Sequence, residues 1–281
     1  MNSAIILAII AHIFWASGNL ANVKLSRTIT PLQTITWQTI LLIPLLLLFI
    51  ISEPLAVDVW VIAYTALLST TLYAGSLMFY TALKKGSAQI SGAIIATVPA
   101  FVTLLSIIFL GASLSIFGIL LITIITIGLV ITSLPNKNNK IDNGIIYAFA
   151  AVVLWAVYFT FISKSVEVLG PYWSSYIAIL AGSVMLVVYS IIKREHKIKK
   201  VSCGLTALLA LSALFVGGAP LAYNIALEQS NPAIIAPIAG SYAPLFIITS
   251  SIIYKDKVTK KQWLGIAITI TAVIVFSVIV N

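Results

Sequence analysis

Charged residues are scarce in this chain of 281 residues, which has 16 basic and 7 acidic side chains. They make up 8% of the sequence, whereas 61% of it is apolar. Soluble domains average about a quarter charged residues and about half apolar ones. So few charges cannot cover the surface of a 30.2 kDa globule. The composition therefore argues against a soluble enzyme, a nucleic-acid-binding protein and a disordered chain.

The groups that usually perform catalysis or bind metals are also rare. Cys203 is the single cysteine, which excludes an intramolecular disulfide framework and a thiolate metal cluster. The two histidines, His12 and His196, are far apart in sequence, and no Asp or Glu falls within a long apolar segment. An intramembrane enzyme would need a carboxylate pair, a metal cluster or a Ser/His dyad, and a channel would show a glycine-rich filter or a charged ring. We expect neither an enzyme nor a channel, and no cofactor or metal.

Ten apolar segments are long enough to cross a membrane, since a hydrocarbon core of about 30 Å needs about 20 helical residues. Every charged residue lies between these segments, as the cost of a charge in lipid requires. Their unbroken apolar character predicts helices rather than the alternating strands of a membrane barrel. The segments are 3–23, 31–51, 59–83, 89–110, 113–133, 143–163, 172–192, 203–226, 232–253 and 262–280.

The second half of the sequence resembles the first. Phe14–Ala16 returns as Leu154–Ala156 at an offset of 140 residues, and Leu77–Leu83 returns as Leu221–Leu227 at an offset of 144. The common order of the two matches is stronger evidence of duplication than either match alone. Because each half holds five spans, the second half must be inverted in the membrane. Inverted repeats are characteristic of secondary transporters, and a duplication that only stabilises a bundle is the alternative.

We therefore predict an all-α integral membrane protein with ten transmembrane helices, arranged as two inverted five-helix repeats in residues 1–135 and 141–281. The loops are too short to hold a soluble domain, so the protein must act within or across the bilayer. Loops after odd-numbered spans hold 15 of the 16 basic residues, and loops after even-numbered spans hold only Lys164. Since positive loops stay in the cytoplasm, both termini are predicted on the opposite side.

Five motifs have a recognisable character: Trp15–Lys24, Tyr80–Ala88, Ala96–Ala100, Phe109–Ser115 and Tyr254–Gly265. Together they resemble the ten-helix, EamA-like branch of the drug/metabolite transporter superfamily, over nearly the whole chain. This chain has Gln38 where that family often has Arg, and Ala112 and Asp256 where it often has Glu. Some relatives have both termini in the cytosol, the opposite of what the charge count predicts here.

The resemblance implies a secondary transporter of a small organic metabolite. Similarity to amino acid exporters favours an amino acid or similar zwitterion, exported by alternating access through a central aromatic and uncharged cavity. Aromatic rings also attract cations, so uptake or exchange of a choline-like or S-adenosylmethionine-like compound is the alternative. The expected partners are this small molecule, the lipid bilayer and, if transport is coupled, a proton; no nucleic acid is expected. We expect a monomer in the cytoplasmic membrane of a prokaryote.

Polar and aromatic side chains at membrane depth are the candidates for substrate binding. They are costly in lipid and tend to face a cavity, although hydrogen bonds between helices are the common alternative. His12, Trp15 and Asn19 share one face of the first span, and Trp155 is the equivalent of Trp15 in the second half. The predicted substrate-binding residues are His12, Trp15, Asn19, Trp37, Gln38, Tyr80, Trp155, Tyr158, Tyr223, Asn224 and Tyr242.

Proton coupling has few candidates, because no acidic residue lies inside a span. His12 is the one side chain within the spans whose ordinary pKa is near neutral pH. Glu228 lies at the end of the eighth span. A facilitator or an exchanger would need neither residue.

The predicted orientation can be tested with a reporter that is active only in the cytoplasm. A fusion after Asn281 should be inactive, whereas a matched fusion within the basic loop 193–200 should be active. The reason is the retention of basic loops in the cytoplasm. Strong activity at Asn281 would contradict the orientation and leave the helical assignment untouched.

Overall fold

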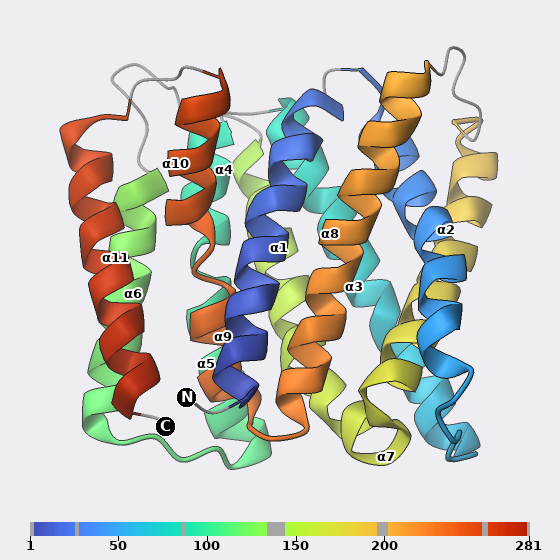
Figure 1. Ribbon diagram of the computed structural model, residues 1–281, viewed down its shortest axis with the longest axis horizontal. Coiled ribbons are helices and arrows are strands. Elements are labelled where there is room, and N and C mark those ends of the chain that lie inside the picture. The colour runs from blue at the N-terminus through green and yellow to red at the C-terminus, as the bar shows by residue number, and fades with distance from the viewer. Residues whose placement is uncertain are drawn as a thin grey trace.

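The computed structural model describes residues 3–25, 28–85, 88–133, 144–195, 202–254 and 258–279. Within these ranges every regular element is a helix, and the helices form one bundle (Figure 1). The beginning of α1 and the end of α11 lie at the same end of this bundle (Figure 1). The helices are α1 (Ser3–Leu25), α2 (Pro31–Ile50), α3 (Val59–Lys85), α4 (Ala88–Ile95), α5 (Val98–Leu110), α6 (Ile116–Ser133), α7 (Gly144–Ile192), α8 (Cys203–Leu227), α9 (Pro232–Ala239), α10 (Ala243–Tyr254) and α11 (Lys260–Ile279).

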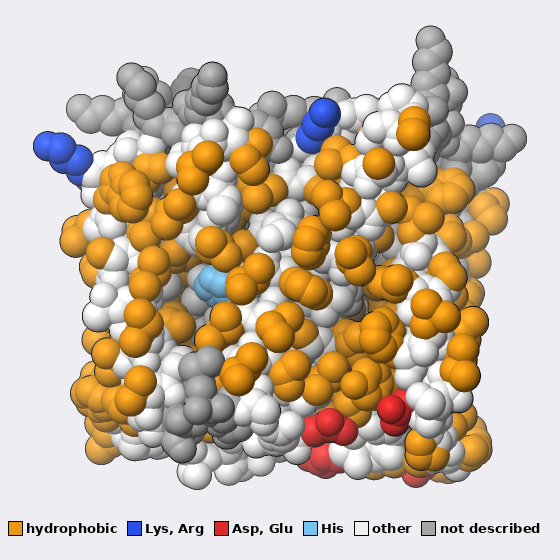
Figure 2. Space-filling model, in the orientation of Figure 1, with side chains coloured by type: hydrophobic (Ala, Val, Ile, Leu, Met, Phe, Trp, Pro, Cys, Tyr) orange, Lys and Arg blue, Asp and Glu red, His pale blue; other side chains and the backbone are white. Residues whose placement is uncertain are grey.

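The surface of the bundle is that of a protein embedded in lipid. In the described part of the chain, eight helical segments are long and apolar enough to cross a membrane, and α5 is a shorter apolar helix. Hydrophobic side chains cover the visible sides, Lys and Arg lie toward one end, and Asp and Glu lie toward the other (Figure 2). The structure differs from ten continuous helices in two respects. Two expected spans are joined in one element, and two others are broken.

The joined spans are 143–163 and 172–192, which together form α7 with a sharp bend at Gly170. Gly170 has φ 72° and ψ 166°, a conformation essentially confined to glycine. The following Pro171 lacks the N–H that would continue the backbone hydrogen bonds. Two arms rise from this bend (Figure 1), so the chain reverses direction there.

The broken spans are 89–110 and 232–253. Residues 96–97 separate α4 from α5, and residues 240–242 separate α9 from α10. Each break comes shortly before a proline, Pro99 or Pro244. A proline ring clashes with the carbonyl group four residues earlier and cannot donate to it. The sequence predicted a kink at each proline, and the structure has a full interruption of the helix.

The two breaks pack against each other. Gly240 lies so close to the ring of Pro99 that an added Cβ would be 2.6 Å from the proline Cγ. α5 and α9 are also in direct contact. The irregular backbone of both halves is therefore gathered in one place, inside the protein.

Helix boundaries recur in the second half at a constant spacing. α4 and α9 both have eight residues, and they begin 144 residues apart, at 88 and 232. α3 and α8, like α6 and α11, also begin 144 residues apart. The capping side chains follow the same spacing. Asp58 accepts a hydrogen bond from the N–H of Trp60, and Ser202 accepts one from the N–H of Leu205. The expected boundary between the repeats, 135–141, lies outside the described residues.

Small residues let the long helices approach closely. Gly182 in the second arm of α7 lies against the ring of Tyr73 in α3. Gly128 of α6 lies against Thr269 of α11, and Gly265 of α11 lies against Thr132. Such contacts between small residues are the usual way in which membrane helices associate. They hold α3 against α7 and α6 against α11.

Gly182→Ala should destabilise the protein, because the added methyl group would overlap the Tyr73 ring. Overpacking of this kind costs about 1–3 kcal/mol, which should lower the midpoint of thermal unfolding in detergent. Gly204→Ala in α8 is the matched control, since a Cβ added at Gly204 would have no atom within 4 Å. Equal stability of the two variants would contradict the close α3–α7 contact.

Candidate functional site

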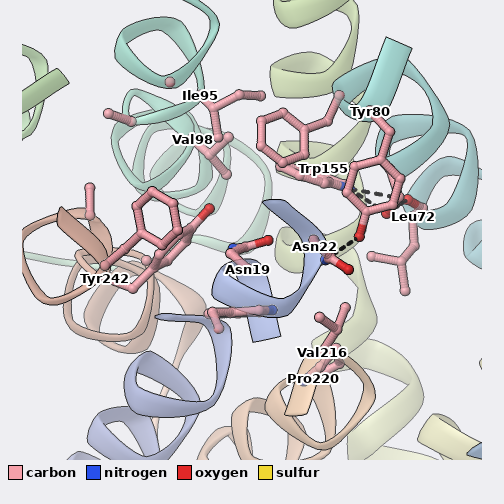
Figure 3. Close-up of a pocket in the computed structure, with 18 of the residues that line it drawn as sticks. Asn19, Asn22, Leu72, Tyr80, Ile95, Val98, Trp155, Val216, Pro220 and Tyr242 are labelled. Carbon is pink, nitrogen blue, oxygen red and sulfur yellow. Dashed lines mark hydrogen bonds between the residues drawn. The ribbon is translucent and has the colours of Figure 1, made fainter. Parts of the chain in front are cut away.

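A cavity of about 1070 Å³ lies where the two broken helices meet. Its wall includes Ala96 and Pro99 at the first break and Gly240 and Tyr242 at the second. Further lining residues come from α1, α2, α3, α7, α8 and α10. Both halves of the chain therefore build the cavity, which lies in the interior of the bundle (Figure 3).

Most of the residues predicted to bind substrate lie in this wall, and three do not. His12, Trp37 and Asn224 are absent from the lining of the cavity. The eight predicted residues that the structure brings together there are Trp15, Asn19, Gln38, Tyr80, Trp155, Tyr158, Tyr223 and Tyr242.

The three other residues contact neighbouring helices. The Nδ1 atom of His12 lies 3.2 Å from the carbonyl oxygen of Ile238 in α9. Trp37 packs beside the small apolar cluster that contains Leu25. Asn224 is fully buried and donates to the hydroxyl of Ser175 at 2.9 Å. The structure thus places these side chains in contacts between helices. Their predicted role in binding stays a prediction.

One aromatic cluster centres on Trp15. Its ring meets the ring of Phe159 edge-on at 5.3 Å between centroids, and it lies 6.3 Å from Tyr223 and 6.2 Å from Tyr242. Phe159 in turn lies 5.2 Å from Tyr158. These edge-to-face and tilted contacts are favourable geometries for aromatic rings, and they fix the rings of the wall in one arrangement.

A second cluster centres on Trp155, the repeat equivalent of Trp15. The Trp155 indole N–H donates to the Leu72 carbonyl oxygen at 3.1 Å and to the Ser76 hydroxyl at 3.3 Å. Gly75 lets the indole lie directly on α3, since a Cβ there would be 2.6 Å from the indole Cδ1. The ring of Phe79 lies 5.3 Å away. Trp155 is therefore anchored to α3, and its N–H is already used.

A polar network joins four helices beside the cavity. The Nδ2 atom of Asn22 donates to the Tyr80 hydroxyl oxygen at 2.7 Å (Figure 3). Gln38 donates through Nε2 to the Asn22 Oδ1 atom at 2.7 Å and to the Ser212 hydroxyl at 2.6 Å. The Ser212 hydroxyl also donates to Asn22 Oδ1 at 2.8 Å. Asn19 lies between this network and Tyr242, whose hydroxyl it faces (Figure 3).

The electrostatic character of the wall is simple. Lys84 is the one charged residue in the described lining, and no Asp or Glu is found there. Lys84 lies at the end of α3, and Val258 and Gln262, at the start of α11, line the same region. The cavity therefore extends toward the end of the bundle where the predicted cytoplasmic loops lie. At the other end, the Ser3 hydroxyl contacts the Gln229 side chain.

Sequence reasoning missed several residues of the site. Phe79 and Phe159 line the cavity, and each directly precedes or follows a predicted tyrosine. Adjacent positions in a helix are turned by about 100°, so a single predicted face could not include both. Ser212 completes the polar network from α8. Asn22 was interpreted as packing between helices, and it also lines the cavity.

The candidate coupling residue Glu228 lies outside the main cavity wall, at the C-terminal cap of α8. It borders a smaller hollow of about 410 Å³ with Glu53, Tyr172 and Trp173. Within the described residues, no group of three or more His, Cys, Asp or Glu side chains could hold a metal ion.

Comparison with known proteins gives the same architecture. A solved crystal structure superposes with a TM-score of 0.82 over 99% of this chain and 97% of that chain, at 15% sequence identity. The uncharacterized inner membrane transporter YedA of Escherichia coli (strain K12) is 28% identical over 130 residues. That match covers 46% of this chain and 42% of YedA, and the YedA of strain O157:H7 matches equally. The chain thus matches less than half the length of these relatives.

The EamA-like transporter family matches the chain twice, over residues 2–134 and 142–278. The two matches together cover nearly all of both halves, and the family consists of transporters rather than enzymes. This chain is therefore a multi-pass membrane protein that belongs to the EamA-like transporter family.

Proposed function

We propose that this protein is a secondary transporter that exports a small zwitterionic metabolite, such as an amino acid, across the cytoplasmic membrane by alternating access. The observation that carries the proposal is the cavity of about 1070 Å³, which is large enough for such a molecule. Its wall combines aromatic rings with neutral amides and hydroxyls. Small-molecule sites are typically apolar pockets with a few convergent polar groups.

The ten-span, inverted-repeat arrangement is part of this proposal. The two arms of α7 would count as separate spans, while α4 with α5 and α9 with α10 would each form one interrupted span. The equal spacing of helix starts in the two halves supports this division. Broken helices that meet at a central site are characteristic of transporters built from inverted repeats. The inner-membrane location of YedA supports the same location for this chain.

The alternative substrate is a quaternary ammonium or sulfonium compound. The ring cluster around Trp15 supports it, because a cation is attracted to the face of an aromatic ring. The described lining, however, contains no carboxylate to balance a net positive charge. The zwitterion accounts for more of the wall.

The proposal is tested by binding and transport together. Purified protein should show a raised unfolding temperature with one class of compound in a screen of amino acids, amines, nucleosides and sugars, because a bound ligand stabilises the native state by mass action. The same compound, loaded as a radiolabel into proteoliposomes, should exchange across the bilayer. Failure of every compound to bind or exchange would overturn the proposed function.

Trp15→Ala and Trp155→Ala should each lower transport by about tenfold or more, since a loss of about 1.4 kcal/mol in binding already gives that factor. Trp15→Ala would remove the centre of one ring cluster, and Trp155→Ala the anchor of the other. Trp60→Ala is the matched control, because Trp60 is 86% exposed outside the cavity. Normal transport by both cavity variants, at equal protein levels, would contradict the aromatic site.

His12→Gln tests whether transport is coupled to protons through this residue. His12 contacts the Ile238 carbonyl of the broken span, so its protonation could bias the position of α9. The glutamine amide can still donate to that carbonyl but cannot titrate. Under proton coupling, transport by the variant should lose its dependence on pH. A slower variant with an unchanged pH profile would assign His12 a structural role.

A further inference from the structure

The hydrogen bonds beside the cavity have a fixed direction. The Asn22 Oδ1 atom accepts from both Gln38 and Ser212, so the amide nitrogen of Asn22 faces the other way. That nitrogen donates to the oxygen of Tyr80. Both hydrogens of Gln38 Nε2 are used, one on Asn22 and one on Ser212. The network therefore runs from Gln38 through Asn22 to Tyr80, where it ends.

Tyr80 is left with a hydrogen to donate. A phenol has one O–H donor in addition to its acceptor lone pairs, and Asn22 occupies the oxygen as a donor. Among the described residues, none accepts the Tyr80 hydrogen. The side chain is 6% exposed, and it lines the cavity. A buried donor without a partner is costly, so this hydroxyl is suited to an acceptor that enters the cavity.

Other groups around the cavity are donors too. The Tyr242 hydroxyl faces the Asn19 side chain on the opposite side of the cavity from Tyr80 (Figure 3). Within the described part of the chain, no acceptor is found for the indole N–H of Trp15, in contrast to that of Trp155. Donor groups thus converge on one space from α1, from α3 and from the break before α10.

The backbone adds positive potential to the same space. α5 has 13 residues and α10 has 12, and their first residues, Val98 and Ala243, line the cavity. The N-terminus of a helix carries about half a positive charge and attracts anions. Lys84 borders the cavity, and the described lining contains no carboxylate. All of these contributions have the same sign.

We infer that the cavity binds substrates through a carboxylate, which accepts hydrogen bonds from Tyr80 and Tyr242 beside the N-termini of α5 and α10. The inference rests on the proposed transport function and specifies its substrate class. A carboxylate is required, and an amino group is optional. Amines and quaternary ammonium compounds without a carboxylate are excluded.

Matched probes separate the two ends of the substrate. L-Phenylalanine, phenylpropanoate and phenethylamine share a side chain and differ in which charged group they keep, as do L-leucine, isocaproate and isoamylamine. Binding to the purified full-length protein is measured by thermal shift and isothermal calorimetry, with choline as a further cation. We expect binding in at least one series by the amino acid and its carboxylate, and none by the amine or by choline.

Tyr80→Phe and Tyr242→Phe should each weaken the binding of the carboxylate probe by about tenfold or more, as expected for a lost hydrogen bond to a charged group. Tyr64→Phe is the matched control, since the Tyr64 hydroxyl donates to the Phe161 carbonyl and does not line the cavity. The unfolding temperature of each apo variant shows whether it is folded. If Tyr80→Phe does not fold, Tyr242→Phe decides.

The outcomes separate this inference from the transport function on which it rests. Tight binding of an amine or of choline, or unchanged carboxylate binding by the folded tyrosine variants, would overturn the inference and leave a transporter of another substrate class. Binding of only a nucleoside or a sugar in the wider screen would do the same. A complete absence of binding and exchange would overturn the transport function itself.

Discussion

The structure depends on one constraint: backbone N–H and C=O groups cannot remain unpaired in lipid. Continuous helices meet it in every long segment, and the chain can interrupt a helix only where protein or a polar cavity surrounds the break. The two interruptions lie together, with Gly240 against Pro99, and both open onto the cavity. A substrate site therefore forms where the backbone departs from regularity, and the outer helices remain unbroken against the lipid.

The polar side chains of the cavity solve the same problem at a second level. Gln38, Asn22 and Ser212 are each almost completely buried, yet they satisfy one another through short hydrogen bonds. Such a network can be buried without a net charge. It also leaves its last member, Tyr80, with an unused donor. The wall is consequently stable when empty and still able to bind.

The sequence predicted the helices well, because hydropathy reports directly on burial in lipid. It also indicated much of the cavity, since the repeat made Trp15 and Trp155 equivalent. It could not give depth along a helix. His12 shares a face with Asn19, but it lies seven residues away, about 10 Å along the axis, and contacts Ile238 instead. Nor could it distinguish neighbours: Asn224 follows Tyr223, yet it turns to Ser175.

Gln38 illustrates how the electrostatics of the wall restrict the substrate. An arginine at this position, as often occurs in related sequences, would place a buried charge beside Asn22 with no carboxylate in the described lining to balance it. Glutamine keeps the network neutral, and its hydrogen bond to Asn22 turns the amide nitrogen of Asn22 toward Tyr80. A zwitterion adds no net charge to such a site, so carrying it across the membrane avoids most of the cost of burying an ion. The cavity then needs only to match the two ends of the molecule: its carboxylate to the free donors and its ammonium group to the aromatic rings.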